Sequence, residues 1–117
     1  MNIEPTNLFA VLAHDTRLRC LMLLHSHGEL CVCELTQAIG QVQPHISRHL
    51  ALLREAGLVA DRRDGLWIYY RLHPELPDWV REVLRATAEE ARNLEPFSRD
   101  LLVLAEMPNR PGAPKCA

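Results

Sequence analysis

Two cysteines stand one residue apart in the segment ELCVCEL, at positions 31 and 33. Thiolates are soft ligands that prefer soft, thiophilic ions. A structural zinc site usually needs four ligands, and the chain has no C-x-x-C or His-x-x-His pair that would complete one beside Cys31 and Cys33. The spacing therefore favours a soft ion held by few sulfurs over a four-coordinate zinc ion.

The two side chains cannot reach one ion from an intact helix. Residues two apart on a regular helix point roughly 200° away from each other. We expect Cys31 to lie just outside a short helix and Cys33 to lie near its N-terminus, where the helix dipole favours a thiolate. Binding of one ion by both cysteines would then distort the start of that helix.

The composition predicts one globular, cytoplasmic domain. The chain has 117 residues, of which 48% are apolar, and this length suits one hydrophobic core. No apolar run approaches the ~18 residues of a membrane span, and the N-terminus lacks the pattern of a secretory signal. In a reducing compartment the four cysteines are expected as thiols, not as a disulfide scaffold.

The charge is distributed unevenly along the chain. The formal net charge is -2, which by itself argues against a nucleic-acid partner. Residues 43–73, however, carry five arginines and three acidic residues, so this segment is locally basic. The arginines are Arg48, Arg54, Arg62, Arg63 and Arg71, and the acidic residues are Glu55, Asp61 and Asp64.

Apolar periodicity indicates helices along most of the chain. The first covers about 5–14. The second starts at Thr16 with Asp15 as its N-cap and ends at Gly28. A short helix follows over about 33–39 and ends at Gly40. Pro44 then opens a helix in which Ile46, Leu50, Leu53 and Ala56 repeat at helical spacing.

The second half of the chain adds a β-hairpin and a longer helix. Two β-prone runs flank Asp64-Gly65, which has the turn chemistry of a hairpin. The pattern from Trp79 to Ala91 then indicates a longer helix. The tail PNRPGAPKCA is too rich in Pro and Gly to fold alone. We therefore expect a domain over 1–95 and a C-terminal extension over 96–117, flexible from about 108.

This order of elements is that of a winged helix-turn-helix, mainly α with a small β-hairpin. From about Leu8 to Val80 the chain resembles the ArsR/SmtB family of metal-responsive bacterial repressors. The resemblance rests on the segments LAHDTRLRCLMLL, ELCVCEL, HISRHLALLREAGLV and DGLWIYYRL. ELCVCEL is most similar to the arsenic- and antimony-responsive branch, whose sensing thiols start the helix before the recognition helix. The resemblance implies a repressor that leaves operator DNA when trivalent arsenic, antimony or a methylated arsenical binds the cysteines.

The third thiolate ligand is the point at which the chain departs from this branch. Such sensors usually have a third cysteine three residues after the second, and Thr36 stands there. Cys116 on the tail is the main candidate for a third ligand, while Cys20 fits a small buried core residue better. Cys31 and Cys33 alone would suffice for a methylated arsenical, which has two exchangeable positions.

A second family site, which binds zinc through Asp and His on the last helix, is not expected. Asp78 fits its first position, but Val80 replaces the next histidine and no histidine follows His73.

In such a fold the recognition helix presents its N-terminal half to the major groove of double-stranded DNA. Gln and Arg can contact bases bidentately, whereas Ser and His can contact phosphate or bases. In the wing, the arginines beside the turn are expected to contact phosphate or the minor groove. The alternative is that they are ordinary solvent-exposed charges at the tip of a hairpin. The predicted DNA-binding residues are Gln43, His45, Ser47, Arg48, His49, Arg62 and Arg63. Val42 lacks the side chain needed to cap this helix, so capping is expected to be poor.

A repressor of this kind reads a palindrome as a homodimer. The first and last helices carry more apolar residues than a small core needs, so they are expected to form the interface. The candidates are Leu8, Phe9, Leu12, Val80, Val83 and Leu84, with a purely intrachain core as the alternative.

Two other function classes are open to a chain with these cysteines. A redox-sensing transcription factor could use the same cysteines, with Cys31 or Cys33 pairing with Cys116, since a pair one residue apart is geometrically strained. An enzyme would need a phosphate-cradling loop or a C-x-x-C after a strand, and the sequence has neither.

Overall fold

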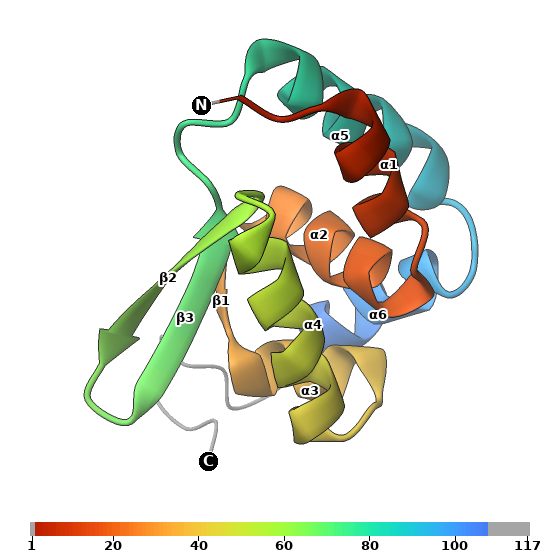
Figure 1. The fold of residues 1–117 in the computed structure, drawn as a ribbon. Helices are drawn as coiled ribbons and strands as arrows, with labels where there is room; N and C mark the ends of the chain where they lie inside the picture. The colour runs from red at the N-terminus through yellow and green to blue at the C-terminus, as the bar shows by residue number, and fades with distance from the viewer. Residues whose placement is uncertain (1, 108–117) are drawn as a thin grey trace.

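The computed structural model describes residues 2–107, which fold into helices around one side of a small sheet (Figure 1). The helices are α1 (Pro5–Leu12), α2 (Asp15–His27), α3 (Val32–Ile39), α4 (Gln43–Glu55), α5 (Asp78–Ala91) and α6 (Phe97–Ala105). The strands are β1 (Glu29–Cys31), β2 (Val59–Asp64) and β3 (Trp67–Leu72). Within residues 2–107, no helix is both long enough and apolar enough to cross a membrane.

Helix α2 is the centre of the core, because other elements pack on several of its faces. Its residues 19–24 are all buried, and α1, α3, α4, α5 and α6 contact it. The prediction that Asp15 is the N-cap is wrong, because His14 occupies that position. His14 has extended backbone, and its Nδ1 accepts a hydrogen bond from the Thr16 N–H at 3.1 Å. A neutral imidazole can accept a hydrogen bond just as a carboxylate can. Gly28 ends the helix, as predicted.

Helices α3 and α4 form the predicted helix-turn-helix. Gly40 ends α3 with a left-handed φ of 78°, a conformation in which glycine has no Cβ clash. Leu35, Ala38 and Ile39 bury the inner side of α3, as expected. Val42 is the N-cap of α4 and makes no side-chain cap hydrogen bond, which confirms the poor capping predicted there.

The wing is a three-stranded antiparallel sheet with the order β1-β3-β2. The predicted hairpin of β2 and β3 is present, with Asp64 opposite Trp67 and Gly65 at φ 63° in the turn. Strand β1 was not predicted; it pairs with β3 and places Cys31 opposite Tyr69. Three residues are too few to show the alternation by which a strand is recognised.

Helix α6 was not predicted either, and it closes the core from the C-terminal side. It contacts α2 and α3, and its Leu104 is fully buried. Asp100 of α6 accepts hydrogen bonds from Arg19 of α2, from Nε at 2.8 Å and from Nη2 at 2.7 Å. The Nη2 group of Arg19 also donates to the carbonyl of Ile39 at the end of α3, at 3.0 Å. One guanidinium therefore joins α2, α3 and α6.

Candidate functional site

Cys31 is the N-cap of α3, in agreement with its predicted place just outside the helix. Its backbone is extended (φ -84°, ψ 163°), and the residue is 1% exposed. Its sulfur accepts from the backbone N–H of Glu34, and the Oε1 of Glu34 accepts from the N–H of Cys31 at 2.9 Å. This reciprocal pair is a capping box, with sulfur in the place of the usual hydroxyl. Cys33 is half-buried in the first turn.

The surroundings of Cys31 favour the neutral thiol. Burial raises the pKa of Cys31, and the N–H groups of Glu34 and Cys33 lower it by a smaller amount. Desolvation therefore outweighs the two backbone hydrogen bonds at this sulfur. A ligand that binds Cys31 has to replace the thiol proton.

The other cysteines differ in their surroundings. Cys20 is fully buried on α2, and burial raises its pKa to about 12, which fits the predicted core role. Cys116 lies outside the described residues. Among residues 2–107, no group of three or more His, Cys, Asp or Glu side chains is arranged to hold a metal ion. Thr36, at the position of the usual third cysteine, donates to the carbonyl of Val32 at 2.8 Å.

The outer face of α4 presents part of the predicted DNA-binding set. Gln43 and Arg48 are exposed, and Ser47 and His45 are partly exposed. Both ring nitrogens of His45 form hydrogen bonds. Arg48 Nη2 donates to the Nδ1 of His45 at 3.1 Å, so the ring proton is on Nε2. That Nε2 donates to Thr16 Oγ1 at 3.3 Å. Thr16 in turn donates to Oε1 of Gln41 at 3.0 Å.

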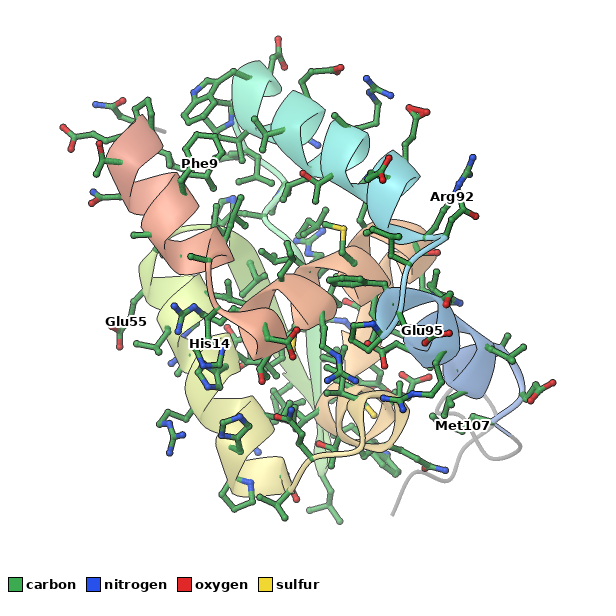
Figure 2. All side chains as sticks on the ribbon, turned by 90° about the vertical axis from the view of Figure 1, so that its right-hand side faces the viewer. Phe9, His14, Glu55, Arg92, Glu95 and Met107 are labelled. Carbon is green, nitrogen blue, oxygen red and sulfur yellow. The ribbon has the colours of Figure 1, made fainter. Side chains whose placement is uncertain are left out.

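His49 is a correction to the prediction, because its side chain is not presented at the surface. The residue is 5% exposed and faces the start of α2, where the labelled His14 lies against α4 (Figure 2). Its ring centroid lies 4.2 Å from that of His14 and 4.6 Å from that of His45. Arg17 Nη1 donates to the Nδ1 of His49 at 3.3 Å. The Nε2 of His49 is buried and has no hydrogen-bond partner among the residues that the structure describes.

Of the three histidines, His49 is the one whose surroundings disfavour the charged ring. Burial, then His14, His45 and two arginines, lower the pKa of His49 to about 4. A neutral His49 packs between α2 and α4, where a charged ring would face Arg17. In this structure the ring therefore packs α4 against the start of α2.

The two wing arginines differ in their availability. Arg62 donates two hydrogen bonds to Glu29 of β1, from Nε at 2.9 Å and from Nη2 at 2.7 Å. Its guanidinium carbon also lies 4.4 Å from the centroid of the Tyr69 ring. Arg63 is exposed and forms no ion pair with any residue that the structure describes. Of the two, Arg63 has its charge available for a partner.

Comparison with known proteins gives one consistent answer. The family model described as bacterial regulatory protein, arsR family, matches residues 14–61. The arsenic resistance transcriptional regulator ArsR1 of Pseudomonas putida is 54% identical over 96% of this chain and 86% of its own length. This chain belongs to the ArsR family.

Other ArsR-family members agree in sequence and in fold. The arsenical resistance operon repressor of Escherichia coli is 54% identical over 68% of each chain. The solved structure of the AntR antimony-specific transcriptional repressor is 36% identical, with a TM-score of 0.60 over 74% of this chain and 78% of that one. These relatives are transcriptional regulators, so the chain is an ArsR-family regulator with a winged helix-turn-helix fold and not an enzyme.

The predicted interface residues of this ArsR-family regulator fall into two groups. Leu8, Val80 and Leu84 are buried in the core of their own subunit. Phe9, labelled in Figure 2, is 52% exposed. Leu12 and Val83 are partly buried against the core. Phe9, Leu12 and Val83 therefore keep part of their surface exposed, whereas Leu8, Val80 and Leu84 belong to the core.

Three contacts at the site were missed by reasoning from the sequence. His14 and Thr16 hold α4 from α2, and Glu29 holds the wing. The burial of His49 had a signal, since it lies on the same helical stripe as Ile46 and Leu53. The pairing of Glu29 with Arg62 spans 33 residues and had no local signal.

Proposed function

We propose that this ArsR-family regulator is a homodimeric repressor that binds operator DNA through α4 and the wing, and leaves it when a trivalent arsenical or antimonial binds Cys31 and Cys33. The observation that supports this most directly is the capping box at the start of α3. The sulfur of Cys31 holds the first turn of the helix that packs against α4.

Ligand binding and capping compete for the same sulfur. When arsenite binds, each S–H and As–OH pair is replaced by an S–As bond and one water, so the arsenic is neither oxidised nor reduced. The sulfur then loses the geometry in which it accepts from the Glu34 N–H. Loss of an N-cap costs about 0.5–2 kcal/mol, which corresponds to a shift of about two- to thirty-fold between two states.

Binding of one ion by both cysteines should disturb the start of α3 more than loss of the Cys31 cap alone. Cys31 has extended backbone, whereas Cys33 lies inside the first turn of α3. One ion can be held by both sulfurs only if the turn between them changes its backbone angles. Because α3 packs against α4, the change alters the recognition helix. DNA favours one state and the ligand favours the other.

The DNA-facing surface is proposed to consist of α4 and the wing. Gln43 and Arg48 are the candidates for base contacts, with Ser47 and Arg63 for phosphate. His45 is already bonded through both ring nitrogens, so it is assigned a supporting role beside Arg48. The positive charge of Arg48 and Arg63 is not matched by an ion pair within residues 2–107.

Dimerisation is proposed to use the exposed apolar residues of α1 and α5. Phe9, Leu12 and Val83 are the contact candidates, with Leu8, Val80 and Leu84 beneath them. A related winged helix-turn-helix domain from Mycobacterium bovis is described as homodimeric; it is 30% identical and has a TM-score of 0.61. Two copies would place two recognition helices on a palindrome.

The test is an arsenical titration of the full chain on an operator duplex selected from a random pool, followed by fluorescence anisotropy. Wild type should release DNA on addition of sodium arsenite or phenylarsine oxide, and zinc should not cause release. Cys31→Ser and Cys33→Ser should bind DNA normally and stay bound. Cys20→Ala is the matched control and should release like wild type. Unchanged release in both serine variants would refute the sensor assignment.

A Cys116→Ser variant in the same assay addresses the third ligand. Cys116 lies outside the described residues, so its role stays a prediction. Loss of release by arsenite, with retained release by phenylarsine oxide, is the result expected if Cys116 completes a three-sulfur site. Release by both compounds would assign the site to Cys31 and Cys33 alone.

A further inference from the structure

The sheet connects the sensing cysteine to the wing by a route that does not pass through α3. Cys31 of β1 is opposite Tyr69 of β3, and Tyr69 is opposite Arg62 of β2. Residues directly opposite each other in an antiparallel sheet place their side chains on the same face. Cys31, Tyr69 and Arg62 therefore form one row across all three strands.

Arg62 closes this row by reaching across β3 to β1. Its guanidinium lies over the Tyr69 ring and donates two hydrogen bonds to Glu29, which is two residues before Cys31 on the same face of β1. We call Glu29, Arg62 and Tyr69 the wing clamp.

The clamp is close enough to Cys31 to sense what binds there. Tyr69 of the clamp is the direct cross-strand neighbour of Cys31 in the pairing of β1 with β3. Cys31 is the last residue of β1 and the N-cap of α3. A change in the backbone at Cys31 therefore affects both β1, which precedes it, and α3, which follows it.

We propose that Arg62 and Glu29 are positioning residues that transmit ligand binding at Cys31 to the DNA-binding wing. The inference rests on the proposed function. With Cys31 unligated, the clamp holds the hairpin tip, and with it Arg63, in the orientation that contacts DNA. Ligation at Cys31 moves the end of β1, separates Glu29 from Arg62 and releases the wing. Arg62 acts through Glu29 and Tyr69, while Arg63 contacts the duplex.

The geometry sets the size of the effect. The side chains of Arg62 and Glu29 are 52% and 32% exposed, so water screens the pair. Exposed ion pairs support changes of about two- to five-fold in an equilibrium, and the bidentate geometry places this pair at the upper end. The α3 route is unaffected, so loss of the clamp should weaken the coupling and not abolish it.

The test measures a coupling factor, defined as the operator Kd at saturating phenylarsine oxide divided by the Kd without it. Glu29→Gln and Arg62→Gln should each lower this factor by about two- to five-fold, and the double variant should lower it no further. Arg63→Gln is the matched control: it removes the same charge from the wing, so it should weaken DNA binding without lowering the factor. Arg62→Lys, which keeps the charge, should lower the factor like Arg62→Gln.

A second measurement reports on the wing itself. The chain has two tryptophans, so Trp79→Phe leaves Trp67, which lies opposite Asp64 beside the hairpin turn, as the sole emitter. Phenylarsine oxide should change its emission in this background, and Glu29→Gln should reduce that change. A merely stabilising ion pair would shift the melting temperature and leave the ligand-induced change in emission intact.

The outcomes separate this proposal from the sensor assignment. If wild type has a coupling factor of one, the proposed function fails and the clamp proposal fails with it. If wild type is released but Glu29→Gln and Arg62→Gln keep its coupling factor, the clamp alone is overturned. A control Arg63→Gln that lowers the factor as much as Arg62→Gln would also overturn it, because the effect would then follow wing charge and not the pairing with Glu29.

Discussion

Removal of the carboxylate of Asp100 should destabilise the protein strongly. Asp100 accepts two short hydrogen bonds from Arg19, and the two side chains are 1% and 7% exposed. Asp100→Ala leaves the guanidinium buried, with Asp15 at 3.4 Å as its remaining acidic neighbour. Removing one partner of a buried ion pair typically costs 3–5 kcal/mol, so we expect a loss of about 3–5 kcal/mol. A small domain has only about 5–15 kcal/mol in total.

Urea unfolding followed by circular dichroism measures this loss. Protein concentration has to be held constant, because dimerisation contributes to the apparent stability. Asp15→Asn is the matched control, since the Asp15 side chain is 60% exposed and its ion pair with Arg19 should contribute about 0–1 kcal/mol. Asp100→Leu combined with Arg19→Met should recover part of the loss, because no charge is left buried, although the carbonyl of Ile39 loses a donor.

The result that refutes this reasoning is a cost for Asp100→Ala no larger than that of Asp15→Asn. It would mean that α6 moves aside and lets water reach Arg19, so that α6 would not be a fixed part of the core. An intermediate in the unfolding curve would point the same way, with α6 leaving before α2 and α3 unfold.

Three further predictions concern single side chains. Burial, and next the neighbouring His14, His45 and two arginines, lower the pKa of His49 from 6.5 to about 4. The unfolded chain therefore binds the proton first, and stability should fall by on the order of 3 kcal/mol as pH drops from about 6.5 to 4. Urea midpoints across this range check this expectation, and a flat profile contradicts it. Val42→Ser should raise stability by about 0.5–2 kcal/mol by supplying the missing cap of α4, seen as a higher melting temperature. Cys20 is fully buried, and burial raises its pKa to about 12. It should therefore resist iodoacetamide at pH 8 in the native protein and react in urea, which mass spectrometry of the labelled peptides measures.

The helix-turn-helix could be predicted from the sequence because its signals are local. Gly28 and Gly40 end two helices at the positions that the pattern indicates. Ile46, Leu50 and Leu53 are all fully buried, as their helical spacing predicts. These features depend on residues within one turn of each other, where backbone preference and apolar spacing suffice.

The parts that were missed depend on contacts between distant segments. Strand β1 exists because β3 offers an edge, not because of its own three residues. Helix α6 had a usable signal, since Phe97, Leu101 and Leu104 repeat at helical spacing, but the Pro-rich surroundings masked it. The availability of Arg62 could not be predicted, because its partner Glu29 is 33 residues away and reaches it across another strand.

Within residues 2–107, the sheet order leaves the outer edge of β2 without a neighbouring strand. An open edge exposes backbone groups that a strand of another molecule can pair with, which is how sheets grow into aggregates. Strand β2 ends in four exposed charged residues, Asp61 to Asp64, although the side chain of Arg62 turns back over β3 toward Glu29. Charged residues on an edge strand oppose pairing with a strand of another copy, so we expect these charges to limit edge-to-edge association. Replacing them together with alanine should raise light scattering before it alters the fold.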